Sequence, residues 1–98
     1  MITHVVVFWT DKPAADLLPT LLPLAQRLGE IPGVHEFRFG PPVPSRRGVV
    51  DDSFSFAISM TFADQAAADA YQQHPIHVEF VEKAVRPYIK RFVVYDFG

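Results

Sequence analysis

The sequence contains no cysteine among its 98 residues. Disulfide bonds and thiolate chemistry are therefore excluded, and the composition fits a reducing compartment. No hydrophobic run approaches the roughly 20 residues that a membrane-spanning helix needs, and no basic segment precedes a hydrophobic one near the N-terminus. We therefore expect a cytoplasmic protein with no membrane partner.

Positive charge is also scarce, since the formal net charge is −2 and the longest basic runs are the pairs Arg46-Arg47 and Lys90-Arg91. Nucleic-acid binding needs a continuous positive surface, so we expect no nucleic-acid partner. Hydrophobic residues are abundant by contrast, at 49%, with nine phenylalanines. We expect a single domain over residues 1–98, whose core is too small to bury all of these large side chains. We therefore expect it to share apolar surface with a second subunit.

The hydrophobic patterns predict an alternation of strands and helices. Strands are predicted at residues 2–9, 34–40, 53–62 and 90–97, and helices at about 16–28, 65–73 and 76–86. In the first helix, Asp16 as the N-cap would place Pro19 in the first turn, where its missing N–H is not needed, and Pro23 would kink the helix. A period of two places Phe54 on the same face as the apolar side chains up to Phe62.

This order is that of a ferredoxin-like split βαβ fold, an α+β fold whose four-stranded antiparallel sheet has helices on one face. The uncovered face is predicted to carry Val5, Val7, Trp9, Ala57, Val93 and Tyr95. Such a face is too apolar to remain in water. We therefore expect a homodimer in which two open sheet faces pack together as a dimeric α/β barrel.

Proton-transferring groups are concentrated in the segment from Tyr71 to His77, which also contains His74 and Pro75. A neutral imidazole is suited to act as a base near pH 7, and a phenol to act as a hydrogen-bond donor. Pro75 interrupts any helix between the two histidines, and no third ligand is evident. No metal site is therefore expected. His74 is interpreted as support for the turn before the proline.

With these elements in place, the chain resembles the stress-responsive A/B barrel (Dabb) family of dimeric α+β barrel proteins. The resemblance rests on the segments 3–8, 31–34, 71–80 and 94–97, together with Ser45 and Phe62. The best-understood relatives are plant polyketide cyclases of the olivetolic acid type, which close an aromatic ring by aldol chemistry without a metal or organic cofactor.

The resemblance implies an acid–base pair formed by His77 and Tyr71. It also implies a substrate pocket lined by His4, Val6, Phe8, Leu21, Leu24, Phe37, Ile58 and Phe80. The cyclases carry aromatic residues on the first helix where this chain has Thr-Leu-Leu-Pro-Leu-Ala at 20–25, so their substrate does not carry over. Some plant relatives hold a cation on backbone carbonyls that would correspond to Leu28, Ile31 and Val34.

A non-catalytic function is equally compatible with these residues. The protein would then be a stress-responsive or small-ligand-binding dimer, with His77 bonded to a backbone carbonyl and Tyr71 as a core aromatic. Cofactorless monooxygenases share the expected fold, but Trp9 is predicted on the sheet face opposite His4. The proline-rich segment 41–48 is predicted to be a surface loop, with or without a role as a gate over the pocket.

Overall fold

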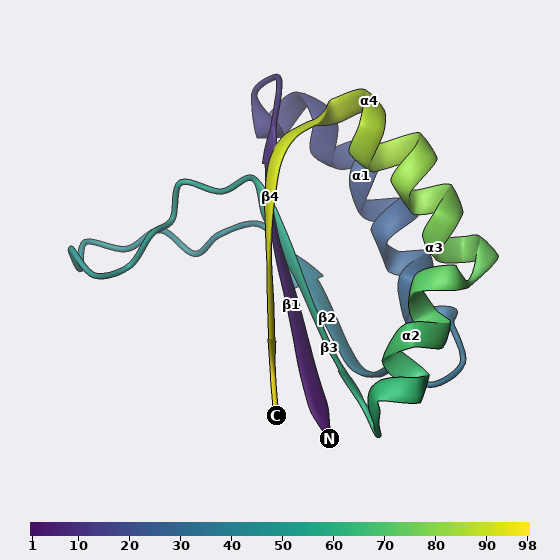
Figure 1. The fold of residues 1–98 in the computed structure, drawn as a ribbon. Helices are drawn as coiled ribbons and strands as arrows, with labels where there is room; N and C mark the ends of the chain where they lie inside the picture. Colours follow the sequence, from purple (N-terminus) through teal and green to yellow (C-terminus); the bar gives the residue numbers. More distant parts are fainter.

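The computed structural model describes all residues 1–98 and shows a single antiparallel sheet with helices on one face (Figure 1). The strands are β1 (Ile2–Thr10), β2 (His35–Gly40), β3 (Phe56–Phe62) and β4 (Ile89–Phe97), in the order β2-β3-β1-β4. The helices are α1 (Ala14–Arg27), α2 (Gln65–Gln73), α3 (Pro75–Phe80) and α4 (Arg86–Tyr88), with a 3-10 turn η1 (Leu28–Glu30) and a π-helical turn η2 (Val81–Val85). The predicted ferredoxin-like α+β fold is confirmed. None of these helices is both long and apolar enough to cross a membrane.

The core lies between the sheet and the helices, and β1 runs through its centre. His4, Val6 and Phe8 are buried on the helix side of β1, whereas the alternate residues between them are only partly buried. The pairing register extends this pattern to both neighbouring strands, since Val6 lies opposite Ile58 of β3 and Val94 of β4. The helix-side core therefore follows from the two-residue period of the strands.

The other face of the sheet has no helix over it. Val5 pairs with Ser59 and Tyr95, and Val7 pairs with Ala57 and Val93, so these side chains share one face. We call this the open face and define it by the predicted residues Val5, Val7, Trp9, Ala57, Val93 and Tyr95. Tyr95 remains 58% exposed, and an Arg91 guanidinium lies 4.4 Å from the centre of the Trp9 ring.

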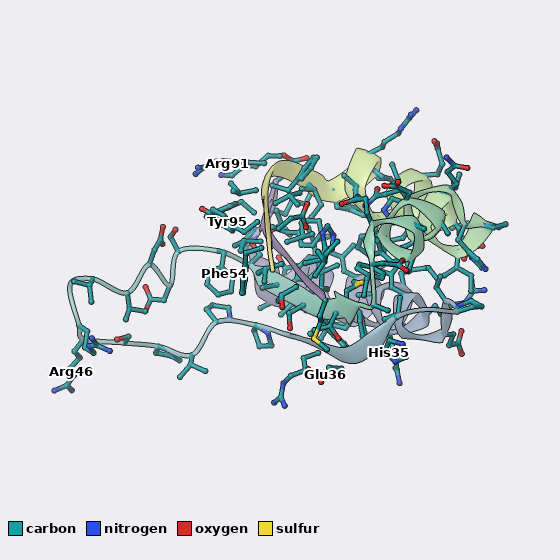
Figure 2. The ribbon with its side chains drawn as sticks, turned by 60° about the horizontal axis from the view of Figure 1, so that its bottom comes forward. His35, Glu36, Arg46, Phe54, Arg91 and Tyr95 are labelled. Carbon is teal, nitrogen blue, oxygen red and sulfur yellow. The ribbon has the colours of Figure 1, made fainter.

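Two strands depart from strict alternation. β2, at the edge of the sheet, contains a bulge between His35 and Arg38, with Glu36 at φ 52°. His35 therefore lies opposite Thr61 and does not share a face with Phe39, as a two-residue period would require. β3 begins at Phe56 and not at residue 53, because the backbone N–H of Ser55 bonds to the Phe8 carbonyl and its hydroxyl bonds to Thr10. The alternation ends there, and Phe54 borders Val7, Trp9 and Tyr95 on the open face (Figure 2).

The helix predicted at residues 65–73 matches α2, whereas the first and last helical predictions differ from the structure at their ends. Helix α1 begins at Ala14 after Pro13 as the N-cap, so Asp16 is not the cap, and both Pro19 and Pro23 lie inside the helix. Burial of Leu17, Leu21 and Ala25 along one face outweighs the two backbone hydrogen bonds that the prolines cannot donate. The last helical region continues past Pro87, which lies in the first turn of α4, where its missing N–H is tolerated.

We predict that Gly29→Ala destabilises the fold by about 1–3 kcal/mol through overpacking. A Cβ at this position would lie 2.8 Å from Cδ2 of Phe37 and 3.1 Å from its Cγ, atoms close to the backbone that have little freedom to move. Gly48→Ala is the matched control, because a Cβ there meets no atom within 4 Å. Urea denaturation measures both variants, and equal stabilities would contradict the packing argument.

Candidate functional site

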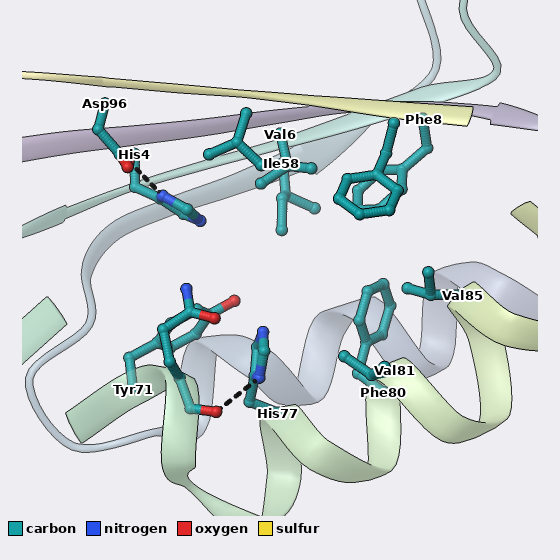
Figure 3. Close-up of a pocket in the computed structure, with 13 residues that line it drawn as sticks. His4, Val6, Phe8, Ile58, Tyr71, His77, Phe80, Val81, Val85 and Asp96 are labelled. Carbon is teal, nitrogen blue, oxygen red and sulfur yellow. Dashed lines mark hydrogen bonds and ion pairs between the residues drawn. The ribbon is translucent and has the colours of Figure 1, made fainter. Parts of the chain in front are cut away.

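A cavity of about 280 Å³ lies between the helices and the half of the sheet formed by β1 and β4. Figure 3 shows the side chains that surround it. Nine of the 13 lining residues are hydrophobic, so the cavity favours an apolar ligand. The lining residues are His4, Val6, Phe8, Ile58, Tyr71, Gln72, His77, Phe80, Val81, Val85, Phe92, Val94 and Asp96.

The polar and apolar lining residues lie at opposite ends of the cavity. Figure 3 shows His4, Asp96, Tyr71 and His77 around one end, and aromatic and valine side chains around the other. At the apolar end the Phe8 and Phe80 rings meet edge to face, with their centres 5.9 Å apart. A ligand with one oxygenated end and one hydrocarbon end matches this division.

The break at Pro75 positions the histidines. α2 ends at Gln73, and His74 is the N-cap of α3, where its Nδ1 accepts a hydrogen bond from the backbone N–H of Ile76 at 3.1 Å. Pro75 fits the first position of α3 because a helix needs no N–H there. His74 thus supports the turn, as predicted, and its capping bond is made with the backbone and not with a ligand.

His77 lies one turn beyond the break, and its ring is turned back toward the end of α2. Its Nδ1 lies 3.0 Å from the carbonyl oxygen of Gln72, which can only accept, so the Nδ1–H is the donor. In the neutral ring this tautomer leaves an unprotonated Nε2 with a free lone pair. Figure 3 shows the ring rising from α3 toward the cavity, which directs this lone pair into the cavity.

Burial keeps the His77 ring neutral. Loss of water around the ring lowers the pKa of His77 from its usual 6.5, the hydrogen bond to the Gln72 carbonyl opposes this, and the nearby His4 lowers it further. A neutral imidazole with a free Nε2 is the form that can accept a proton from a ligand.

Tyr71 is 1% exposed and packs between the two histidines that face the cavity. Its ring centre lies 4.7 Å from that of His77 and 5.8 Å from that of His4. No protein group pairs with the Tyr71 hydroxyl. Since every fully buried polar side-chain atom has a hydrogen-bond partner, this hydroxyl is not fully enclosed, and Tyr71 is one of the residues that line the cavity. Burial strongly raises the pKa of the phenol, which therefore stays protonated as a donor.

His4 is held by a carboxylate that sequence reasoning did not identify as part of the site. Its Nδ1 lies 2.5 Å from Oδ1 of Asp96, which is directly opposite it on β4. The His4 side chain is 8% exposed and that of Asp96 is 58% exposed. The buried imidazole at the polar end of the cavity is therefore hydrogen-bonded to a carboxylate that is in contact with solvent. A period of two in the sequence puts Asp96 on the same face of β4 as Phe92 and Val94, but its pairing with His4 follows only from the register between β1 and β4.

The predicted site residues are only partly brought together. His4, Val6, Phe8, Ile58 and Phe80 line the cavity with Tyr71 and His77, whereas Leu21, Leu24 and Phe37 do not. Leu21 is fully buried in the core, and Phe37 packs on Phe39, with ring centres 5.5 Å apart. These three lie on α1 and β2, whereas the cavity lies beside β1 and β4. The lining residues not predicted are Gln72, Val81, Val85, Phe92, Val94 and Asp96.

No three His, Cys, Asp or Glu side chains are grouped closely enough to hold a metal ion. The carbonyls around Ile31 are engaged within the backbone. The carbonyl of Leu28 accepts a hydrogen bond from Ile31 N–H at 3.2 Å, and that of Ile31 accepts one from Val34 N–H at 3.1 Å.

The segment 41–48 contributes nothing to the cavity lining and projects from the other side of the sheet (Figure 1).

Solved structures with this fold include a Dabb family protein from Mesorhizobium loti, 32% identical, with a TM-score of 0.79 over 99% of this chain and 94% of that one. A dimeric ferredoxin-like protein of unknown function from a Jannaschia species is 26% identical, with a TM-score of 0.71 over 99% and 97% of the two chains. A hydroxynitrile lyase from Passiflora edulis is 18% identical, with a TM-score of 0.79 over 98% and 90%. No functionally curated protein matches the sequence.

The model of one protein family matches nearly the whole chain. It covers residues 2–98, which include the cavity, the open face and the segment from Tyr71 to His77. The resemblance predicted from the sequence is thereby confirmed. The chain belongs to the Dabb family, the stress responsive A/B barrel domain.

Proposed function

We propose that this protein is a cofactor-independent acid–base catalyst, a polyketide-cyclase-like cyclase or lyase that acts beside a carbonyl group of a small hydrophobic, oxygenated molecule. One observation carries the proposal. His77 is held by the Gln72 carbonyl with its Nε2 free toward an apolar cavity, next to a buried phenol, Tyr71, that lines the same cavity. A base and a donor on the same ligand are what enolate chemistry needs.

The reaction would begin with transfer of a proton from a carbon beside the carbonyl to Nε2 of His77. The electron pair moves to the carbonyl oxygen, which accepts a hydrogen bond from the Tyr71 hydroxyl as negative charge develops. In a cyclisation, the enolate carbon then attacks a second carbonyl of the same molecule, and the His77 imidazolium returns its proton to the new alkoxide. His4, oriented by Asp96, adds a second polar contact on the sheet side of the cavity.

One relative with this fold is a lyase. A hydroxynitrile lyase from Passiflora edulis has the same fold, which indicates that the fold is able to carry a lyase site. The cavity itself has a different shape from that implied by the cyclases, because the α1 residues do not line it.

A second candidate function is binding without turnover. The hydrogen bond between His77 and a backbone carbonyl, together with the largely apolar lining, is what a ligand-binding protein with a structural histidine would also have. The two candidates differ in one respect. Catalysis requires proton transfer by His77, whereas simple binding requires only the shape and polarity of its ring.

We predict that His77→Ala lowers turnover of linear polyketide-type substrates by about 10²–10⁴-fold, the usual contribution of a positioned acid–base group. Tyr71→Phe should lower turnover while leaving the fold intact, because only the hydroxyl is removed. His35→Ala is the control, since this exposed histidine lies on β2, away from the cavity. Unchanged turnover in His77→Ala would refute the acid–base assignment. Ligand binding by the wild type with no turnover of any such substrate would favour the binding function.

We predict a pKa for His77 below the usual value of about 6.5 in an NMR titration of the folded protein. Burial lowers this pKa, so the neutral ring stabilises the fold at pH values above 6.5, and that contribution is lost as the pH falls through the folded-state pKa. Protonation of His77 would also set the acidic limb of the pH–rate profile, because the protonated ring cannot act as a base. His77→Gln should remove this part of the pH dependence of stability, and a pKa at or above 6.5 would contradict the argument.

We further propose that the protein is a homodimer that buries the open face. The relative from Jannaschia is described as dimeric, and the open face presents apolar side chains over three neighbouring strands. Tyr95 of the open face is 58% exposed, and Phe97, two residues further along β4, is 63% exposed. Exposed apolar side chains grouped in this way are typical of subunit interfaces.

We predict that Val93→Lys produces a monomer, because the substitution puts a charge at the open face opposite Val7. The control is Val78→Lys, at a valine that is 48% exposed on α3 and distant from the open face. Light scattering at micromolar concentration should show dimers for the wild type and the control and monomers for Val93→Lys. A monomeric wild type would refute the proposed dimer.

A further inference from the structure

The segment between β2 and β3, residues 41–55, is extended and projects from the sheet on the side away from the helices (Figure 1). We call it the arm. In Figure 2, Arg46 marks its tip, and Phe54 and Tyr95 lie on the same side of the sheet as the arm. The arm therefore leaves the molecule on the side of the open face.

The base of the arm is fixed firmly to its own sheet. The backbone N–H of Ser55 donates to the carbonyl of Phe8 at 2.7 Å, and the indole N–H of Trp9 donates to the hydroxyl of Ser53 at 3.2 Å. Pro41, Pro42 and Val43, on the other leg, border the same hollow as Val5 and Ala57 of the open face. These contacts set the direction of the arm and make it continuous with the open face.

The outer part of the arm is ordered by polar contacts within itself. Ser45 N–H donates to Oδ2 of Asp52 at 3.0 Å and so ties the two legs together, and Val50 N–H donates to the Arg47 carbonyl at 3.0 Å. Pro41, Pro42 and Pro44 restrict the backbone further, because each ring fixes φ. A segment that is already ordered loses little conformational entropy on binding.

Two valine side chains of the arm are largely uncovered by the chain itself. Val43 and Val49 are each 82% exposed, compared with 48% for Val78 on α3. The projection also enlarges the molecule, whose radius of gyration is 13.5 Å, whereas about 12.6 Å is typical of a compact domain of this length. An ordered arm that holds two valines in water calls for a partner surface.

The length of the arm fits a second copy of the chain as that partner. From Gly40 to the tip near Arg46, six extended residues span at most about 20 Å. Two sheets that pack face to face lie about 10 Å apart. Since the arm starts at the border of the open face, a copy seated on that face would lie alongside the arm, and the tip would extend past its sheet.

We propose that the arm of each subunit clasps the flank of the other subunit, with Val43 and Val49 packed against the partner. This inference rests on the proposed homodimer through the open face and adds a second contact region to it. By two-fold symmetry the dimer has two such clasps. The arm is therefore an element of assembly and not a lid over the cavity of its own chain.

The test is the double variant Val43→Ser/Val49→Ser, compared with Val78→Ser as a matched valine on α3. Sedimentation equilibrium over a concentration series measures the dimer dissociation constant of each. We expect it to rise at least ten-fold in the double variant and to change less than two-fold in the control. A dimeric wild type with an unchanged constant in the double variant overturns the clasp and leaves the dimer standing. A monomeric wild type overturns both.

A second measurement detects the contact directly. Because the chain has no cysteine, the Gly48→Cys variant can be labelled at this one thiol with an environment-sensitive dye. Gly48 lies near the arm tip, and a Cβ at this position would meet no atom within 4 Å. The dye emission should shift to shorter wavelength as dimers form on concentration, whereas a dye at Val78→Cys should not respond. Identical emission at position 48 in monomer and dimer overturns the clasp.

Discussion

The two-residue period of β1 is the constraint on which both faces of this protein depend. β1 lies between β3 and β4, so its alternation sets the side on which the paired residues of both neighbours lie. His4, Val6 and Phe8 face the helices and the cavity, and Val5, Val7 and Trp9 face the other way. A register shift of one residue would exchange these sets and destroy both surfaces together. The candidate site and the proposed interface are therefore specified by one strand.

The histidine tautomer depends on how a helix ends. Because Pro75 prevents α2 from continuing, the carbonyl of Gln72 is one of the last carbonyls of the helix, which have no partner within it. His77 fills this position with its Nδ1–H, which leaves its Nε2 free in the cavity. The same hydrogen bond thus defines a structural histidine and prepares a base. A structural role for His77 does not count against a catalytic one.

The sequence was sufficient for the fold and for one side of the site, because regular alternation and the proline break carry that information. It was insufficient where pairing between distant segments decides the outcome. The bulge at Glu36 and the bend at Ser55 that turns Phe54 to the open face each depend on contacts between distant segments. The resemblance implies a pocket that includes Leu21 and Phe37, but the cavity lies at the opposite half of the sheet. Asp96 required the register between β1 and β4, which sequence patterns leave unspecified.

The edge strand β4 connects the cavity with the proposed interface. Its alternate residues Phe92, Val94 and Asp96 line the cavity, and Val93 and Tyr95 belong to the open face. β4 pairs only with β1, so within one subunit it is held along one edge only. Phe92 and Val94 line the cavity but remain 53% and 43% exposed. In the proposed dimer, a second copy packed on Val93 and Tyr95 would restrain the strand that presents Asp96 to His4. Assembly would then stabilise the polar end of the cavity without contributing a residue to it.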